Sequence, residues 1–381
     1  MSVRVESTGE MSGELYPASR LARVAAAARE AGLDALLLTP GADLRYVVGY
    51  DAHAQERLTC LAVPAAGGGD PFLLVPELEH PAALASPAGG LGLEITGCNE
   101  TDDPYAQVAA RLGRPAVVGL SDRMWALMVL RLRAALPGAR QELASAALSG
   151  LRARKTDAEI EALAAAGAAI DRVHARVPGW LRPGRTELAV AADITDAILA
   201  EGHARADFAI VASGPNAASP HHAPSDRVLQ HGDAVVVDIG GTMPSGYCSD
   251  CTRTYAIGAP APEFAEYYAV LQAAQEAACA AVRPGITAEA LDAAAREPIT
   301  AAGYGELFVH RTGHGIGLET HEDPYIVSGN AEPLAAGHAF SIEPGIYAGP
   351  HGARIEDIVV CTGSGGRRLN NGTRDLVVVE S

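Results

Sequence analysis

Five side chains of the types that bind metal ions stand at the ends of apolar runs or within glycine-rich turns in the carboxyl-terminal half of this chain. They are Asp238, Asp250, His314, Glu343 and Glu356. A carboxylate at the tip of a buried strand is unfavourable unless a cation pairs with it. We therefore expect a fold whose rigid strands and turns bring the five side chains together around a pair of metal ions.

The chemistry of these donors indicates which ions they suit. Four carboxylates and one imidazole supply mostly oxygen ligands, and each carboxylate can chelate one ion or bridge two. That mixture suits manganese, or another borderline-hard divalent ion, better than a structural zinc site, which favours thiolates. Two ions roughly 3.5–4 Å apart would hold a hydroxide between them and polarise a carbonyl group. The set therefore predicts a hydrolytic enzyme.

The two aspartates are expected on adjacent strands of one hairpin, pointing into one cleft. Asp238 ends the run Val235–Val237 and precedes two glycines, while Asp250 lies in an alternating pattern typical of a strand. Considered alone, Asp238 could equally be a residue that opens a turn. It is the presence of Asp250 that favours the shared cleft.

Two further side chains are candidates for roles in catalysis. His321 follows the glycine-rich segment that contains His314, and it could donate a hydrogen bond to a tetrahedral intermediate. Arg354 and Glu356 are two positions apart, so in a strand they share a face. The local sequence leaves open whether Arg354 pairs with Glu356 or meets a carboxylate of the substrate.

Length and charge restrict the remaining possibilities. A chain of 381 residues is expected to form two domains, because single cores stop growing near ~250–300 residues. The net charge of −17 argues against nucleic acid or an anionic membrane as a partner. The amino terminus lacks an apolar core of the signal-peptide type, and no apolar stretch reaches spanning length, so we expect a soluble, cytoplasmic protein.

The cysteines do not indicate a disulfide scaffold, because six of them are spread thinly along the chain. Cys248 and Cys251 form a Cys-x-x-Cys pair, which would be compatible with redox chemistry or half of a zinc site. No second pair accompanies it, and Asp250 inside the pair already has a role as a ligand. A redox or zinc function is therefore disfavoured.

The order of helical and strand-like patterns indicates an α/β region followed by an α+β region. In the first region we expect helices at 20–32 and 124–136 and strands at 35–39, 60–63, 72–75 and 116–120. In the second we expect helices at 156–177, 187–201, 263–282 and 288–302, with a strand at 208–212. Helices grouped outside an antiparallel sheet define the α+β class.

The ordered motifs resemble those of a known family. They are Asp238-Ile-Gly, Ser249-Asp-Cys-Thr-Arg-Thr254, Gly313-His-Gly-Ile-Gly317, Ser341-Ile-Glu-Pro-Gly345 and Arg354-Ile-Glu-Asp357. This set is similar to the pita-bread-fold metallopeptidases, in particular the proline-specific branch of Xaa-Pro dipeptidases (prolidases) and Xaa-Pro aminopeptidases. The resemblance implies a creatinase/prolidase-like amino-terminal domain at 1–152 and a pita-bread catalytic domain at 153–381.

The resemblance also implies how the ligands divide between two divalent metal ions in each subunit. Asp238 would chelate one ion, His314 and Glu343 the other, and Asp250 and Glu356 would bridge both. Manganese is the first expectation for the metal, with cobalt, zinc or iron as alternatives. A metal-bridging hydroxide would then attack the carbonyl group of an Xaa-Pro bond.

Catalytic roles follow from the same resemblance. Glu343 would pass a proton to the prolyl nitrogen, His221 matches a histidine on the substrate side, and His321 matches one beside the intermediate. Arg354 completes the catalytic set, and His222 is interpreted as structural. The expected substrates are proline-containing dipeptides or short peptides, and a homodimer is expected.

One departure from the family bears on the substrate. Tyr325 takes the place where some prolidases have an arginine that binds the carboxylate of proline. A dipeptide would then need another cation, such as Arg354 or, from a second subunit, Arg45 or Arg57. We favour the dipeptidase over the aminopeptidase, because the chain is shorter than many aminopeptidases of this branch.

Three other functions are compatible with parts of the sequence. A pita-bread binding module without hydrolytic activity and a metal-free amidinohydrolase of the creatinase type are both disfavoured, because all five ligands are intact. A methionine aminopeptidase is disfavoured because such a large amino-terminal domain is not expected there.

Overall fold

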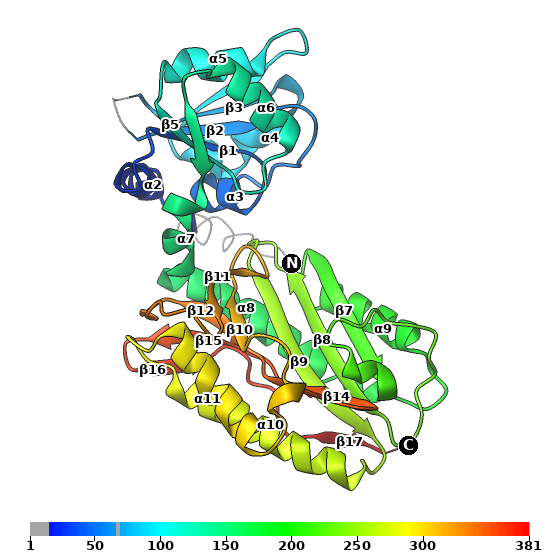
Figure 1. The fold of residues 1–381 in the computed structure, drawn as a ribbon. Helices are drawn as coiled ribbons and strands as arrows, with labels where there is room; N and C mark the ends of the chain where they lie inside the picture. The colour runs from blue at the N-terminus through cyan, green and yellow to red at the C-terminus, as the bar shows by residue number, and fades with distance from the viewer. Residues whose placement is uncertain (1–14, 66–68, 381) are drawn as a thin grey trace, which may run out of the picture. The chain divides into compact units, whose positions relative to one another are not determined.

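The computed structural model describes residues 15–65 and 69–380, and the chain separates into two compact units, Met1–Arg152 and Ala153–Ser381 (Figure 1). The amino-terminal stretch for which no signal-peptide core is expected lies outside the described residues. None of the described helices combines the length and the apolar character that crossing a membrane requires.

The amino-terminal unit is built on a six-stranded sheet with the order β4-β3-β2-β1-β5-β6. Strand β2 runs antiparallel to both of its neighbours, and the other pairs are parallel. The strands are β1 (Ala35–Leu38), β2 (Cys60–Pro64), β3 (Phe72–Pro76), β4 (Glu94–Cys98), β5 (Val117–Leu120) and β6 (Arg140–Leu143).

Helices of this unit flank the sheet. Tyr105 and Val108 of α5 and Met128 and Leu132 of α6 share one buried core with the strands. The α-helices are α2 (Ser19–Glu30), α3 (Ala42–Val48), α4 (His80–Ala85), α5 (Pro104–Leu112), α6 (Ala126–Ala135) and α7 (Ser145–Ala153), with short 3-10 turns at Glu77–Glu79 and Pro87–Gly90. The predicted strands at 35–39, 60–63, 72–75 and 116–120 are confirmed as β1, β2, β3 and β5.

The carboxyl-terminal unit contains two main sheets and a hairpin. One sheet has the order β17-β9-β8-β7, and the other has the order β11-β10-β12-β15-β16, while β13 and β14 pair with each other. The strands are β7 (Arg205–Ser213), β8 (Ala234–Thr242), β9 (Cys248–Ile257), β10 (Gly313–Gly315), β11 (Glu322–Ile326), β12 (Ala339–Ile342), β13 (Gly345–Ala348), β14 (His351–Arg354), β15 (Asp357–Thr362), β16 (Gly365–Arg368) and β17 (Val377–Val379).

Each main sheet of this unit packs one face against a pair of helices. The first sheet packs on α8 (Asp157–His174) and α9 (Glu187–Ala200), and the second on α10 (Pro262–Ala281) and α11 (Ala288–Ala301), which lie side by side in Figure 1. Apolar residues fill both contacts, so the opposite faces of the strands are left for polar side chains. The α+β class predicted for this region is confirmed.

Helix α8 shows how the sequence sets the start and the end of an element. Thr156 accepts a hydrogen bond from the backbone of Glu159, and the Glu159 carboxylate accepts one from the backbone of Thr156, which forms a capping box. The helix ends at His174, earlier than the predicted residue 177, and a short 3-10 turn at Val177–Gly179 follows. Pro178 lies in that turn and lacks the N–H that a continuing helix needs.

Candidate metal centre

Strands β8 and β9 carry the first two candidate ligands. They form an antiparallel hairpin in which Asp238 lies opposite Thr252 and Asp250 lies opposite Gly240, as predicted for neighbouring strands. Val237 and Ile239 pack in the core against α8 and α9. Because side chains alternate along a strand, Asp238 and Asp250 both point to the opposite, inner face.

The next two ligands come from the second sheet. His314 is the middle residue of β10, and Glu343 follows the end of β12. The backbone N–H of Glu343 donates to the carbonyl oxygen of Thr312 over 2.8 Å, which brings the two side chains to neighbouring positions. A Cβ atom on Gly313 would overlap the carbonyl oxygen of Ser341, so this close approach of β10 and β12 requires glycine there.

Glu356 lies in the link between β14 and β15. Its backbone N–H donates to the carbonyl oxygen of Thr252 over 3.1 Å, and its Oε2 accepts from Thr252 Oγ1 over 2.8 Å. Strand β9 therefore holds Glu356 through Thr252, which lies two residues after Asp250 and on the same face.

These placements bring the predicted ligands together in one buried cluster. His314 Nε2 lies 3.1 Å from Glu343 Oε1 and 3.6 Å from Asp250 Oδ2. One ligand atom each from Asp250, His314 and Glu356 fall within 4.8 Å of one another. Asp238 joins the same group through Arg354, whose Nη2 lies 2.6 Å from Asp238 Oδ2.

The charges of this cluster are unbalanced without a cation. Burial raises the pKa of Asp250 well above its usual range, and the carboxylates of Glu356 and Asp238 raise it further. Burial likewise raises the pKa of Glu356, and Glu343 and Asp238 add to the effect. For Glu343, burial acts to raise the pKa, but the hydrogen bond with His314 and the charges of His314, His310 and Arg354 together outweigh it and lower the pKa to about 2.

Two observations show that the residues fit divalent ions. Asp238 Oδ1 and Glu356 Oε1 are buried oxygens with no hydrogen-bond partner among the described residues, although each carboxylate has its second oxygen bound. His314 Nδ1 lies 3.1 Å from the carbonyl oxygen of Gly315 and can keep a proton there, so Nε2, which faces the carboxylates, would be free to bind a metal ion that replaces its proton. The cluster thus offers unused oxygen atoms and an oriented imidazole.

Arg354 stabilises the cluster from one side. Its guanidinium binds Asp238, the Tyr347 hydroxyl at 2.7 Å, Thr252 Oγ1 at 3.2 Å and the carbonyl oxygen of Pro220 at 3.2 Å. The direct pairing with Glu356 that was one of the two interpretations is not observed. Strand β14 ends at Arg354, so the alternation that would place the two side chains on one face stops before Glu356.

The two histidines that were expected to take part in catalysis lie in different surroundings. The rings of His321 and His314 meet edge to face, with centroids 4.0 Å apart. Burial lowers the pKa of His321 to about 4, and the charge of His314 contributes, so His321 is neutral near pH 7. His221 is exposed on the loop after the 3-10 turn η4 (Gly214–Ala218), whereas His222 binds Glu187 Oε2 over 2.9 Å, in keeping with a structural role.

Comparison with known proteins identifies the family. Residues 161–363 match the model of metallopeptidase family M24, and residues 20–154 match the creatinase/prolidase N-terminal domain. The chain belongs to metallopeptidase family M24. The pita-bread resemblance inferred from the motifs is therefore confirmed, and the family implies divalent metal ions.

Individual relatives cover nearly the whole chain. A probable dipeptidase PepE of Mycobacterium tuberculosis is 55% identical over 368 residues, which cover 96% of this chain and 97% of the relative. An Xaa-Pro dipeptidase of Lactobacillus delbrueckii subsp. lactis is 37% identical, with 92% of this chain and 96% of the relative covered. The crystal structure of dipeptidase PepE from Mycobacterium ulcerans is 56% identical and superimposes with a TM-score of 0.90 over 96% of this chain and 98% of that one. This M24 peptidase is a metallo-exopeptidase.

Arg311, a cationic side chain near His314, was not singled out from the sequence. The guanidinium carbon of Arg311 lies 4.5 Å from the centre of the Tyr325 ring, and Tyr325 pairs with His314 across strands β10 and β11. Within residues 15–65 and 69–380, no carboxylate forms an ion pair with Arg311. In the sequence, Arg311 could have been noticed because it lies three residues before His314. That position alone does not show which way the side chain points.

The two arginines of the amino-terminal unit that were considered as substrate ligands have carboxylate partners there. Arg45 binds Asp51 Oδ2 over 2.7 Å, and Arg57 binds Glu56 and Glu100, each over 2.7 Å. Their ion pairs lie on the surface and give no sign of a preformed carboxylate site.

The Cys-x-x-Cys pair forms no site of its own. Cys248 and Cys251 are three positions apart in β9, so they point to opposite faces of the strand. Both thiols are buried and free, and Cys251 packs in the core with α8 and α9. This arrangement excludes chelation of one zinc ion by the two thiols.

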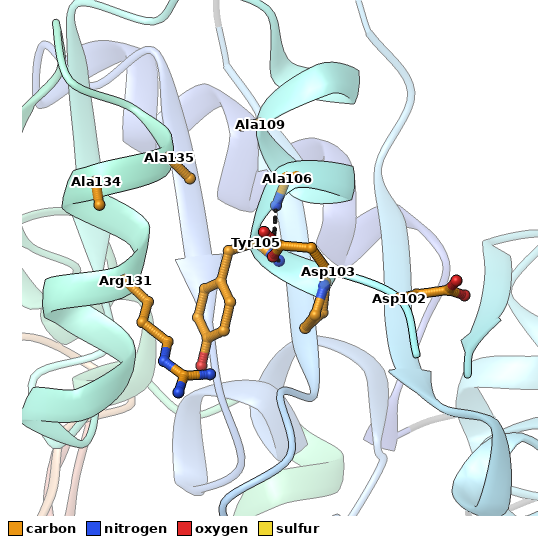
Figure 2. Close-up of a pocket in the computed structure, with 9 residues that line it drawn as sticks. Asp102, Asp103, Tyr105, Ala106, Ala109, Arg131, Ala134 and Ala135 are labelled. Atoms are coloured by element: carbon orange, nitrogen blue, oxygen red, sulfur yellow. Dashed lines mark hydrogen bonds between the residues drawn. The ribbon is translucent and has the colours of Figure 1, made fainter. Parts of the chain in front are cut away.

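A separate cavity of about 690 Å³ lies between α5 and α6 in the amino-terminal unit (Figure 2). Asp103 Oδ1 accepts from the backbone N–H groups of Tyr105 and Ala106 and so caps α5, and alanines form much of the remaining wall. The candidate metal ligands all belong to the other unit, and no acid–base or nucleophilic constellation is found among the residues that line this cavity.

Proposed function

We propose that this M24 peptidase is an Xaa-Pro dipeptidase that holds two divalent cations with Asp238, Asp250, His314, Glu343 and Glu356. The observation that carries the proposal is the buried cluster of four carboxylates and one imidazole with unused oxygens on Asp238 and Glu356. The preference for proline is supported by the relative named Xaa-Pro dipeptidase, which aligns with nearly the whole chain.

The metal ions would supply Lewis acidity that activates water and polarises the carbonyl group of the scissile bond. Manganese is our first expectation among the divalent ions, because oxygen ligands dominate the set. All ligands except the imidazole are carboxylates, and their combined negative charge would stabilise two bound dications against release into water.

Glu343 and His321 would handle the proton and the developing negative charge during hydrolysis. Hydrolysis adds the oxygen of water to the carbonyl carbon, breaks the C–N bond and transfers a proton to the prolyl nitrogen. Glu343 suits this transfer because its side chain is 16% exposed, so it reaches the open side of the cluster. His321 is neutral and retains an N–H that can donate to the carbonyl oxygen as negative charge develops on it.

The free carboxylate of a dipeptide requires a cation, and Arg311 is the residue that we assign to it. Arg354 is unsuited to this role because its guanidinium is 3% exposed and already binds Asp238, Tyr347 and Pro220. Arg311 instead stacks on Tyr325 without a carboxylate partner among the described residues. An aminopeptidase would have no need of such a cation, because its substrate continues beyond proline.

A comparison of three peptides tests the proposal. Purified protein is stripped of metal, reloaded with Mn(II) and assayed on Ala-Pro, Ala-Pro-Ala and Ala-Ala. We expect cleavage of Ala-Pro in preference to the other two. Cleavage of Ala-Pro-Ala with little cleavage of Ala-Pro would make the enzyme an Xaa-Pro aminopeptidase, and preference for Ala-Ala would overturn the proline specificity.

A further inference from the structure

A buried carboxylate outside the metal cluster gathers an unusual number of hydrogen-bond donors. Glu187, the first residue of α9, is fully buried. Its Oε1 accepts from Ser213 N over 2.7 Å, Ser213 Oγ over 2.6 Å and Asn216 Nδ2 over 3.1 Å. Its Oε2 accepts from His222 Nε2 over 2.9 Å, Ser225 N over 3.1 Å and Ser225 Oγ over 2.7 Å.

These donors keep Glu187 ionised. Burial by itself would raise the pKa of this carboxyl group, but the hydrogen bonds from Ser213 and Ser225 outweigh it and lower the pKa to about 2. Arg227 lies close by, where it binds Ser213 Oγ and Asp233. A buried carboxylate with this many donors is a fixed anchor rather than an adaptable surface group.

All of the donors belong to one segment of the chain, residues 213–225. This segment starts at the end of β7, passes through η4 and contains His221, the histidine assigned to the substrate side. Glu187 binds the segment at both ends, at Ser213 and at Ser225. Its bond to His222 fixes the residue directly after His221.

The opposite side of the same segment contacts the metal centre. The carbonyl oxygen of Pro220 accepts from Arg354 Nη1 over 3.2 Å, and Arg354 in turn binds Asp238. Strand β14 packs against η4, and a Cβ atom on Gly352 would overlap the carbonyl oxygen of Ala217. The segment is thus held between Glu187 and Arg354, with His221 between Pro220 and His222.

From this arrangement we infer that Glu187 is a positioning residue for catalysis, which fixes the 213–225 segment and with it His221, the histidine assigned to the substrate side. The inference rests on the proposed function, because it gives a consequence for peptide hydrolysis. Glu187 itself touches neither the ligands nor the substrate. It acts by fixing the backbone on both sides of His221.

The chemistry of the site explains why a glutamate is needed. A carboxylate only accepts hydrogen bonds, and all the groups around it donate. A glutamine would turn one acceptor into an NH2 group facing either the Ser213 N–H or the Ser225 N–H. Either orientation leaves a backbone donor without its partner, at the buried Ser213 or at the half-buried Ser225, which frees one end of the segment.

A double-mutant cycle tests the inference. We expect E187Q to lower kcat/KM for Ala-Pro by about 10–100-fold, the range found for residues that orient active-site groups, while the Mn(II) content is unchanged. In the H221A background, E187Q should cost less than about twofold, because the group that it positions is already absent. Full additivity of the two losses would overturn the inference, as would wild-type kinetics of E187Q.

Two further variants separate positioning from general loss of stability. H222Q keeps an N–H donor for Glu187 and should retain most of the activity, whereas H222A should behave like E187Q. As a matched control, D34N removes a carboxylate that accepts from the backbone of Ala116 and Val117 in the other unit, and it should leave kcat/KM unchanged. If E187Q fails to fold, S225A removes the hydroxyl donor to Glu187 Oε2, leaves the backbone N–H in place, and is carried through the same cycle.

Hydrogen–deuterium exchange distinguishes failure of the inference from failure of the proposed function. E187Q should increase exchange in peptides covering 214–224 without increasing it in the β8–β9 hairpin. If the wild-type protein cleaves no prolyl peptide, the proposed function fails, and unchanged exchange at 214–224 would then overturn the positioning role independently.

Discussion

At the scale of single residues, the centre combines groups that oppose folding with groups that limit their cost. Asp250 and Glu356 are almost fully buried, and burial together with the neighbouring carboxylates raises the pKa of both. Arg354 is the guanidinium that binds the cluster directly, and it does so through Asp238. Burial of several carboxylates close together disfavours folding, and such local costs are typical of functional sites.

Replacement of Arg311 tests the proposed contact with the substrate carboxylate. R311A should raise KM for Ala-Pro by about 10–100-fold, because a charged hydrogen bond contributes about 1.5–3 kcal/mol. Alanyl-prolinamide lacks the carboxylate, so its kcat/KM should be nearly the same in the wild type and in R311A. R311K serves as the charge-preserving control, and an equal loss on both substrates would contradict the assignment.

The residue scale also shows which parts of the site the sequence reveals. The five candidate ligands could be predicted because each lies in a motif with a recognisable strand end or glycine turn. Glu187 and Arg311 were not predicted, because the roles proposed for them depend on partners that only the folded chain brings close. Glu187 follows Thr186, the N-cap of α9, and so reads as an ordinary first-turn acidic residue.

At the scale of elements, strands that contain an apolar run could be predicted from the sequence, whereas strands with mostly polar or exposed side chains could not. Strand β8 was predicted from its valines, and the hairpin with β9 followed from the alternation around Asp250. Strands β4 and β6 have partly exposed side chains and no apolar run, and they were not predicted. The short β13–β14 hairpin was also missed, and it places Tyr347 and Arg354 beside the cluster.

A buried histidine between elements gives the unit a defined pH dependence. His174 of α8 contacts the Tyr255 hydroxyl over 2.9 Å and the carbonyl oxygen of Cys251 over 3.0 Å on β9. Burial, followed by the charge of Arg253, lowers the pKa of His174 from 6.5 to about 3. The folded form therefore resists a proton that the unfolded form accepts, so this stability is fully present above pH 6.5 and is lost as the pH falls towards 3.

Comparison with H174Q isolates that contribution, since glutamine keeps a donor for Cys251 and does not titrate. The free energy of unfolding of the wild type should fall more steeply than that of H174Q between pH 6.5 and pH 4, by up to about 1.4 kcal/mol per pH unit, and the melting temperature should follow it. Parallel pH profiles of the two proteins would show that His174 is not a buried neutral base.

At the scale of the whole molecule, the candidate metal centre depends on how the carboxyl-terminal unit is layered. Helices α8 and α9 cover one face of the first sheet, and α10 and α11 cover one face of the second, so the ligands on both sheets project from the faces left uncovered. The ligands come from strands separated by more than a hundred positions in the chain, from Asp238 to Glu356. The order of the motifs predicted that these side chains would come together. No single helix or strand would have shown it.

Titration of the metal-free protein with Mn(II), with bound ions and Ala-Pro hydrolysis measured on the same samples, tests the central claim most directly. We expect two ions per chain and activity that rises as they bind, whereas E356Q should bind fewer ions and lose about 100-fold or more in kcat. Hydrolysis by fully metal-free protein, or two bound ions without cleavage of Ala-Pro, would contradict the account.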